Sequence, residues 1–126
     1  MSEINAWCAG FFDGEGCIGL YLGKQWIASV SVSQRDEMPL MVFQQLFGGT
    51  KVPHGPKRDS LRIQFKKVEA WHMLNTLLPH LVVKRKQAEL MLEFWQIENI
   101  KTGSGLKRAE AIAAEIKRLK RPWQDI

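Results

Sequence analysis

The chain has 126 residues, of which 45% are hydrophobic, and carries 18 Lys and Arg against 13 Asp and Glu, a formal net charge of +5. Five prolines, ten glycines and two cysteines exclude collagen-like, disordered and disulfide-scaffold classes and predict one domain with a single core. No apolar run approaches the roughly 20 residues that span a bilayer, and residues 1–10 do not resemble a signal peptide, so we expect an intracellular protein without membrane contact.

Positive charge is concentrated in the middle third of the chain. Residues 51–86 carry nine Lys and Arg against two acidic residues, a net +7, whereas residues 1–50 carry a net −3. A basic segment of this size is typical of proteins that bind a polyanion, most commonly nucleic acid. A solvated lysine-rich surface is the alternative, and charge alone does not choose between the two.

The first third of the chain is predicted to be a helix followed by a β-hairpin. Residues 4–12 are mostly apolar and predict a short helix that stops at residues 13–16, where glycines can adopt positive φ. Residues 17–22 and 26–33 alternate between apolar and small or polar side chains, which predicts two antiparallel strands with one apolar face.

A second helix and a second hairpin follow. Asp36 is the predicted N-cap of a helix that runs to Phe47 and is closed by the glycines at 48–49. Residues 50–65 predict a hairpin with its turn at Gly55-Pro56 and an alternating return strand.

The remaining chain is predicted to be helical. Helices are expected over residues 68–78 and 84–100, interrupted at Pro79, and over residues 106–119 after a flexible break at 102–105. Antiparallel strands segregated from helices predict an α+β domain.

The segment around Asp13 carries the most information. Ala6, Gly10 and Gly14 recur at every fourth position, so one helix face is nearly bare and lets a second helix backbone approach closely. Asp13 and Glu15 fall at the helix C-terminus, where the macrodipole disfavours negative charge unless a cation binds. A solvated turn is the alternative, and these residues by themselves favour it.

Residues 8–16, CAGFFDGEG, resemble the nine-residue signature of the LAGLIDADG homing endonucleases. The segment departs at its first position, has Phe for two aliphatic residues, and has Gly14 and Glu15 in place of Ala and Asp, each substitution keeping the apolar, small or acidic character. Gln34 and residues 78–88 also look like family segments. The resemblance covers residues 4–100, while residues 101–126 look like the family's variable C-terminal helices, so residues 1–126 are expected to form a single endonuclease domain.

The resemblance implies a helix-hairpin-helix-hairpin-helix fold, in which a saddle-shaped antiparallel four-stranded sheet lays its concave face in the DNA major groove. Only one signature is present, which implies a homodimer and a pseudo-palindromic double-stranded DNA target. The bare helix face would form the dimer interface, and no small-molecule substrate is expected. The implied interface residues are Ala6, Gly10, Asp13 and Gly14.

Three catalytic residues are carried over from the family, namely Glu15, Gln34 and Lys84. Glu15, with Gly14, looks like the family's metal site, and Mg²⁺ suits such oxygen ligands. Gln34 and Lys84 match positions that order water and stabilise charge around the phosphate. The cations at 84–86 oppose a helix dipole unless an anion is near, and we expect a DNA phosphate there. Asp13 is expected to be structural, bonding backbone donors at the helix interface.

Strand alternation selects a polar sheet face that would meet DNA. Arg62 is suited to bidentate contact with guanine, and Gln25 or Gln64 to contact with adenine. For each residue an ordinary solvent-facing strand position is the alternative. The candidate DNA-binding residues are Tyr21, Gln25, Ser29, Ser31, Ser33, Arg35, Lys51, Lys57, Arg58, Arg62, Gln64 and Lys66.

The predicted function is that of a metal-dependent, sequence-specific homing endonuclease that leaves a staggered double-strand cut in DNA. A catalytically silent DNA-binding regulator and an RNA-splicing maturase of the same fold are alternatives, and so is an interaction domain without nucleic acid. The joint presence of Glu15, Gln34 and Lys84 argues against the regulator, and the +7 segment argues against the interaction domain.

Overall fold

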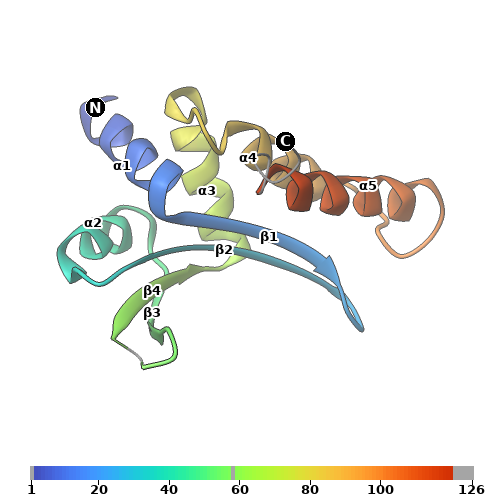
Figure 1. The fold of residues 1–126 in the computed structure, drawn as a ribbon. Coiled ribbons are helices and arrows are strands. Elements are labelled where there is room, and N and C mark those ends of the chain that lie inside the picture. Colours follow the sequence, from blue (N-terminus) through green and yellow to red (C-terminus); the bar gives the residue numbers. More distant parts are fainter. Residues whose placement is uncertain (1, 58, 121–126) are drawn as a thin grey trace.

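A computed structural model describes residues 2–57 and 59–120 (Figure 1). The helices and strands follow one another in the predicted order of helix, hairpin, helix, hairpin and then helices. They are α1 (Ser2–Glu15), β1 (Gly16–Leu22), β2 (Trp26–Gln34), α2 (Glu37–Phe47), β3 (Thr50–His54), β4 (Ser60–Phe65), α3 (Lys67–Leu77), the 3₁₀ turn η1 (Leu78–His80), α4 (Arg85–Phe94) and α5 (Gly103–Leu119). The fold is α+β, as predicted.

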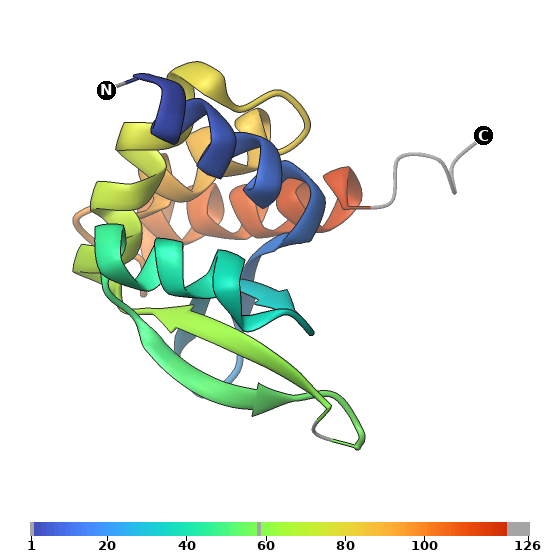
Figure 2. The same cartoon turned by 90° about the vertical axis from the view of Figure 1, so that its left-hand side faces the viewer.

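The four strands form one antiparallel sheet in the order β1-β2-β4-β3, which leaves β1 and β3 at its edges. The sheet is curved like a saddle, and the helices lie over its convex side (Figures 1 and 2). No described helix covers the concave side. Pro53 is tolerated within β3 because an edge strand can lose one ladder N–H.

The core lies between the convex face of the sheet and the helices. Ile18, Val32 and Ile63 point from three neighbouring strands toward the helices and are fully buried. Phe12 of α1 and Met91 of α4 pack into the same cluster. Alternation thus buries every second strand residue and leaves the remainder on the concave face.

The ends of α2 are as predicted. The Asp36 carboxylate accepts a hydrogen bond from the backbone N–H of Met38 at 3.1 Å, so Asp36 is the N-cap. Gly48, with φ of 84°, ends the helix in a conformation that other residues rarely adopt.

The first helix ends within the predicted segment 13–16, but the expected ending by glycines with positive φ is wrong. α1 continues through Gly14 to Glu15 and passes directly into β1, and neither Gly14 nor Gly16 has positive φ. Gly16 is required for space instead, because a Cβ there would lie 2.6 Å from the ring of Phe12. The junction between α1 and β1 is therefore tight and has no intervening loop.

Two predictions near the C-terminus are also wrong. α4 ends at Phe94 rather than at residue 100, and the indole N–H of Trp26 donates to the Ile100 carbonyl at 2.9 Å, which holds the irregular segment against the sheet. The predicted break at 102–105 includes the first turn of α5. Gly105 lies inside this helix because its missing side chain lets the backbone pass against the Asn99 carbonyl. No described helix is long and apolar enough to cross a membrane.

Candidate functional site

The α1–β1 junction brings together two of the predicted catalytic residues. Glu15 is the last residue of α1 and is exposed, and Lys84 is the N-cap of α4. The ammonium of Lys84 donates to the backbone carbonyl of Asp13 at 2.6 Å. Residues 71 positions apart in sequence thus meet at one corner of the sheet.

Asp13 has a structural role in this corner. Its carboxylate accepts hydrogen bonds from the backbone N–H groups of Val82 and Lys84, each at 2.9 Å. The anion at the start of α4 is therefore the Asp13 carboxylate of the same chain, and the expected need for a phosphate there is not supported. Asp13 does bond backbone donors as predicted, but they belong to its own chain.

Lys84 is half-buried, and this burial is the main cause that lowers the pKa of its ammonium below the ordinary value. The negative charge of Asp13 and Glu15 opposes the shift, whereas the nearby ammonium of Lys120 adds to it. The site therefore places a partly desolvated cation beside a free carboxylate, where its charge acts more strongly than it would in water.

Gln34 lies at the end of β2, beside the start of β1. Gly16 pairs with Val32, so the C-terminus of α1 and the last residues of β2 share one end of the sheet. Gln34 pairs with Leu61 and lies two residues after Val32, so its position in β2 is on the side of the sheet that faces the helices. Its side-chain oxygen accepts a hydrogen bond from the backbone N–H of Arg35 at 2.8 Å. The structure brings Gln34 to the same end of the sheet as Glu15, without a direct bond between the two.

The oxygen donors at this corner fit a hard divalent cation only in part. No described residue forms a hydrogen bond or ion pair with the Glu15 carboxylate, and Gly14 contributes a carbonyl in the last helical turn, where carbonyls lack helical partners. Both Asp13 oxygens are already bonded. No group of three or more His, Cys, Asp or Glu side chains among the described residues could hold a metal ion. A divalent cation bound at this corner would therefore need further ligands from outside the described residues.

The concave face carries the polar side chains that alternation selected. Ser31 is opposite Gln64 and Ser33 is opposite Arg62, which places all four on this face. The amide N–H of Gln64 donates to the Ser29 hydroxyl at 3.1 Å, which ties two strands together. Tyr21 is exposed at the edge strand. The face predicted for these residues is confirmed, but Ser31 is only 2% exposed, so its side chain is not open to a DNA duplex. A role of the others in DNA contact is not tested by the face that they share.

Lys51 was assigned to the wrong face. It pairs with Ile63, whose side chain points to the core, so Lys51 lies on the helix side, where its ammonium donates to Glu37 of α2 at 2.7 Å. Thr50 and Val52 lie on the concave face instead. The residues of β3 do not alternate between apolar and polar, so only the register of β3 with β4 shows which side of the sheet Lys51 is on.

The other candidate DNA-binding residues lie around the sheet rather than on it. Arg35 follows β2 and pairs with Asp59 at 3.2 Å. Gln25 is in the β1–β2 turn, and Lys57 is exposed in the β3–β4 turn. Lys66 is exposed at the N-cap of α3. Arg58 lies outside the described residues.

The predicted interface face of α1 is open. Ala6, Gly10 and Gly14 are all exposed, and a Cβ added at either glycine would meet no atom within 4 Å. Asp13, seven residues after Ala6, falls on the same side of the helix, but its carboxylate is engaged by backbone donors at the start of α4. A bare, uncovered stripe of helix is thus available for close packing.

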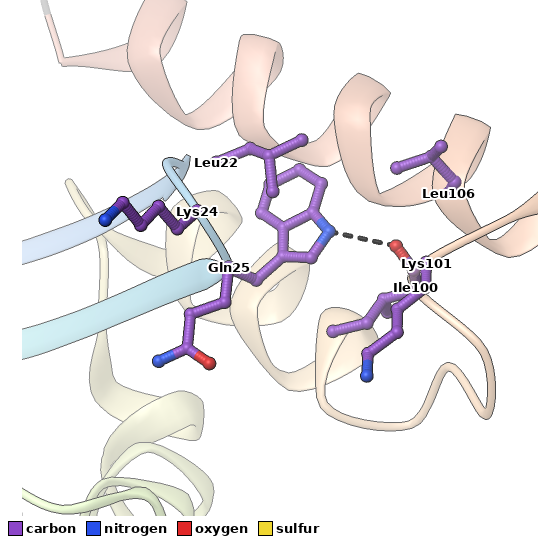
Figure 3. A pocket seen from close by; sticks show the side chains of 7 residues that line it. Leu22, Lys24, Gln25, Ile100, Lys101 and Leu106 are labelled. Atoms are coloured by element: carbon purple, nitrogen blue, oxygen red, sulfur yellow. Dashed lines mark hydrogen bonds between the residues drawn. The ribbon is translucent and has the colours of Figure 1, made fainter.

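A pocket of about 570 Å³ lies at the opposite end of the β1–β2 hairpin (Figure 3). Trp26, Lys24 and Lys101 are among its lining residues, and the indole N–H of Trp26 donates to the Ile100 carbonyl. The described lining contains no carboxylate, histidine or cysteine. This pocket therefore lacks the ligands for metal chemistry, and the α1–β1 corner remains the candidate site.

Comparison with known proteins agrees with this description. No family model matches the chain. A probable intron-encoded endonuclease, aI2, from Debaryomyces hansenii is 34% identical over 77 residues, which are 60% of this chain and 11% of that protein. The chain therefore spans a small part of the curated relative that it matches.

Solved structures share the fold over nearly the whole chain. The homing endonuclease I-CvuI, in complex with the I-CreI target in the presence of Mg, matches with a TM-score of 0.81 and 27% identity, over 94% of this chain and 82% of that one. The archaeal intron-encoded homing endonuclease I-Vdi141I, complexed with DNA, gives 0.80 at 16% identity over 94% and 84%, which shows the fold alone. The LAGLIDADG homing endonuclease I-GzeII, with its DNA target, gives 0.70 at 23% identity over 85% and 41%.

The fold of the chain, with its four-stranded antiparallel sheet, matches that of the homing endonuclease structures. The chain thus resembles the LAGLIDADG homing endonucleases in its fold and in one segment, residues 8–16, that is similar to their signature.

Proposed function

We propose that the chain is a sequence-specific endonuclease that cleaves both strands of DNA as a homodimer, using a divalent metal ion such as Mg²⁺. The observation that carries the proposal is the corner at which the exposed Glu15 carboxylate and the half-buried Lys84 ammonium are near enough to influence each other, at one end of a concave sheet face that carries polar side chains. The relatives are homing endonucleases in complexes with DNA, some of which were formed with Mg or Ca.

Each residue of the corner has a distinct part in the proposed reaction. Glu15, with the Gly14 carbonyl, would hold the divalent ion, whose chemistry in such a site is to lower the pKa of water and neutralise phosphate charge. Lys84 would stabilise the negative charge that develops on the phosphate, because its ammonium is held in place by the Asp13 carbonyl. Gln34 would orient water at the adjacent strand end.

The concave face would supply recognition. A two-stranded ribbon fits the major groove, and Arg62 and Gln64 on this face are suited to reading base edges. The open stripe of Ala6, Gly10 and Gly14 would bring two chains together about a two-fold axis, so that two corners act on opposite strands and leave a staggered cut. A two-fold dimer favours a pseudo-palindromic target.

The test begins with selection of a duplex from a randomised pool, followed by single-turnover cleavage of that duplex in Mg²⁺. Glu15→Gln keeps the side-chain shape and removes the charge, so cleavage should fall by at least about a hundredfold. Binding in Ca²⁺ should persist or tighten, because repulsion between the carboxylate and phosphates is relieved. Glu3→Gln, at an exposed acid in the first turn of the same helix, is the matched control and should cleave like the wild type.

Each outcome separates the alternatives. Equal cleavage by the wild type and Glu15→Gln would place the metal site elsewhere. A wild type that selects a duplex but does not cleave it would be a DNA-binding regulator. Tighter binding to intron RNA than to any selected duplex, measured in parallel, would indicate an RNA-splicing maturase.

A further inference from the structure

The last turn of α5 reaches around the edge of the sheet to its polar face. The ammonium of Lys120, the C-cap of α5, lies 3.9 Å from the sulfur of Cys17 in β1. A Cβ built at Gly19 would meet this ammonium at 3.5 Å and the Cβ of Ser29 at 4.0 Å. Since Ser29 belongs to the concave face, the charge of Lys120 lies over that face, although its helix packs on the other side of β1.

The positive charge of Lys120 is not balanced by an ion pair with a described residue. Its exposed ammonium is near enough to Lys84 for the two charges to repel. Cys17, two residues beyond Glu15, separates this charge from the catalytic corner. The ammonium groups of Lys84 and Lys120 thus lie close enough to repel each other, an arrangement that a bound phosphate would stabilise.

A groove continues from this point along the edge strand. It has a volume of about 380 Å³ and lies between the last two turns of α5 and the outer residues of β1. Lys117, one turn before Lys120, is also in its lining, and both ammonium-bearing side chains are exposed. The groove therefore has one basic wall, and this wall faces the margin of the polar sheet surface.

We propose that Lys120 and Lys117 form a binding site for the sugar-phosphate backbone of the DNA strand that leads into the Glu15–Lys84 corner. This inference rests on the proposed function, because it takes the duplex to lie on the concave face. Both residues hold phosphates and do not read bases, so they set affinity and strand position but not sequence preference. Neither residue belongs to the signature segment, and sequence periodicity places both on an ordinary amphipathic helix.

The test compares Lys120→Met with Lys107→Met in the full chain. Lys107 is an exposed lysine on the same helix, 13 residues or about 20 Å away, so both variants lose the same net charge. Binding is measured without divalent metal, from low to moderate salt, on the selected duplex and on a scrambled one. Lys120→Met should weaken both affinities by the same factor, on the order of tenfold, and should lower the slope of log K against log salt by about one per chain.

Further readouts separate phosphate binding from a structural role. Lys120 also suits the negative end of the α5 dipole, so a purely helix-stabilising role predicts a lower midpoint of thermal unfolding and an unchanged salt slope. Lys120→Arg should restore the slope, since the guanidinium also binds phosphate. In wild-type protein, acetylation of Lys120 should be slowed by bound duplex, while acetylation of Lys107 should not.

The outcomes for this inference and for the proposed function differ. If Lys120→Met behaves like Lys107→Met while the wild type binds and cleaves DNA, the inference is overturned and the nuclease proposal stands. If the wild type binds duplex without cleaving it, and the Lys120→Met slope falls, the inference stands and the nuclease proposal fails. If the wild type binds no duplex, both are overturned.

Discussion

Asp13 and Lys84 bond each other in both directions. The backbone N–H of Lys84 donates to the Asp13 carboxylate at 2.9 Å, and the Lys84 ammonium donates back to the Asp13 carbonyl at 2.6 Å. Asp13 lies in the last turn of α1, just before the edge strand β1, and its carboxylate also binds the backbone at the start of α4. These two hydrogen bonds fix the position of the Lys84 ammonium relative to the end of α1, so it does not move freely as the end of a surface lysine would.

Asp13→Asn should destabilise the fold. One of the two acceptor oxygens becomes an amide N–H that faces a backbone donor, and the negative charge at the start of α4 is lost. We expect the free energy of unfolding to fall by about 2–3 kcal/mol, measured by urea denaturation followed by tryptophan fluorescence. Glu15→Gln is the control, and its free energy of unfolding should change by less than about 0.5 kcal/mol, because the carboxylate is exposed. Equal losses in both variants would contradict the separate roles of the two acids.

Gly10→Leu should separate assembly from folding. A side chain at Gly10 meets no atom of its own chain, and leucine favours helix over glycine by about 0.5–1 kcal/mol, so the folded monomer should be no less stable. A dimer with helices packed at this stripe would have no room for leucine. Sedimentation velocity should show a folded monomer, while Gln45→Leu, on an exposed position of α2, keeps the dimer. A Gly10→Leu dimer of unchanged affinity would rule out this interface.

Arg62→Ala and Lys51→Ala should differ, although both residues are basic and lie in paired strands. Arg62 is on the concave face opposite Ser33, whereas Lys51 is on the helix side and bonds Glu37. Selection from a randomised duplex pool should show relaxed preference at one base pair per half-site for Arg62→Ala, a loss of about 1–3 kcal/mol. The profile of Lys51→Ala should match the wild type. An altered profile for Lys51→Ala alone would show that the duplex does not lie on the concave face.

Glu69 gives the fold a dependence on acid pH. Its carboxylate accepts from the backbone N–H of Lys66 at 2.8 Å, which chiefly lowers its pKa, and from that of Gly49 at 2.9 Å. Because the folded-state pKa lies below the ordinary value of 4.5, this contribution is complete above that value and is lost as pH falls through the folded-state pKa. Glu69→Gln should cost about 1 kcal/mol at neutral pH, measured by urea denaturation. The difference in free energy of unfolding between the wild type and Glu69→Gln should shrink as the pH is lowered. A difference that stays constant with pH would contradict the role given to the Glu69 carboxylate.

Much of this protein was determined by local sequence. The alternation in residues 17–33 and 60–65 predicted the hairpins, because strand side chains point to opposite faces whatever lies around them. Asp36 and Gly48 marked the ends of α2, since capping depends on the backbone within a few residues. The segment around Glu15 indicated the resemblance to the LAGLIDADG homing endonucleases for the same reason, because its residue types and spacing are read along one short segment.

Only the tertiary structure decided which distant residues meet. Lys51 changes face because its register is set by pairing with β4, and no pattern within its own five-residue strand specifies that register. Asp13 accepts from the backbone N–H groups of Val82 and Lys84, 69 and 71 positions away, which no local pattern specifies. Lys120 comes within 3.9 Å of Cys17 across 103 positions because α5 packs along the free edge of the sheet. Such contacts depend on the summed packing of the whole core, which no short sequence window contains.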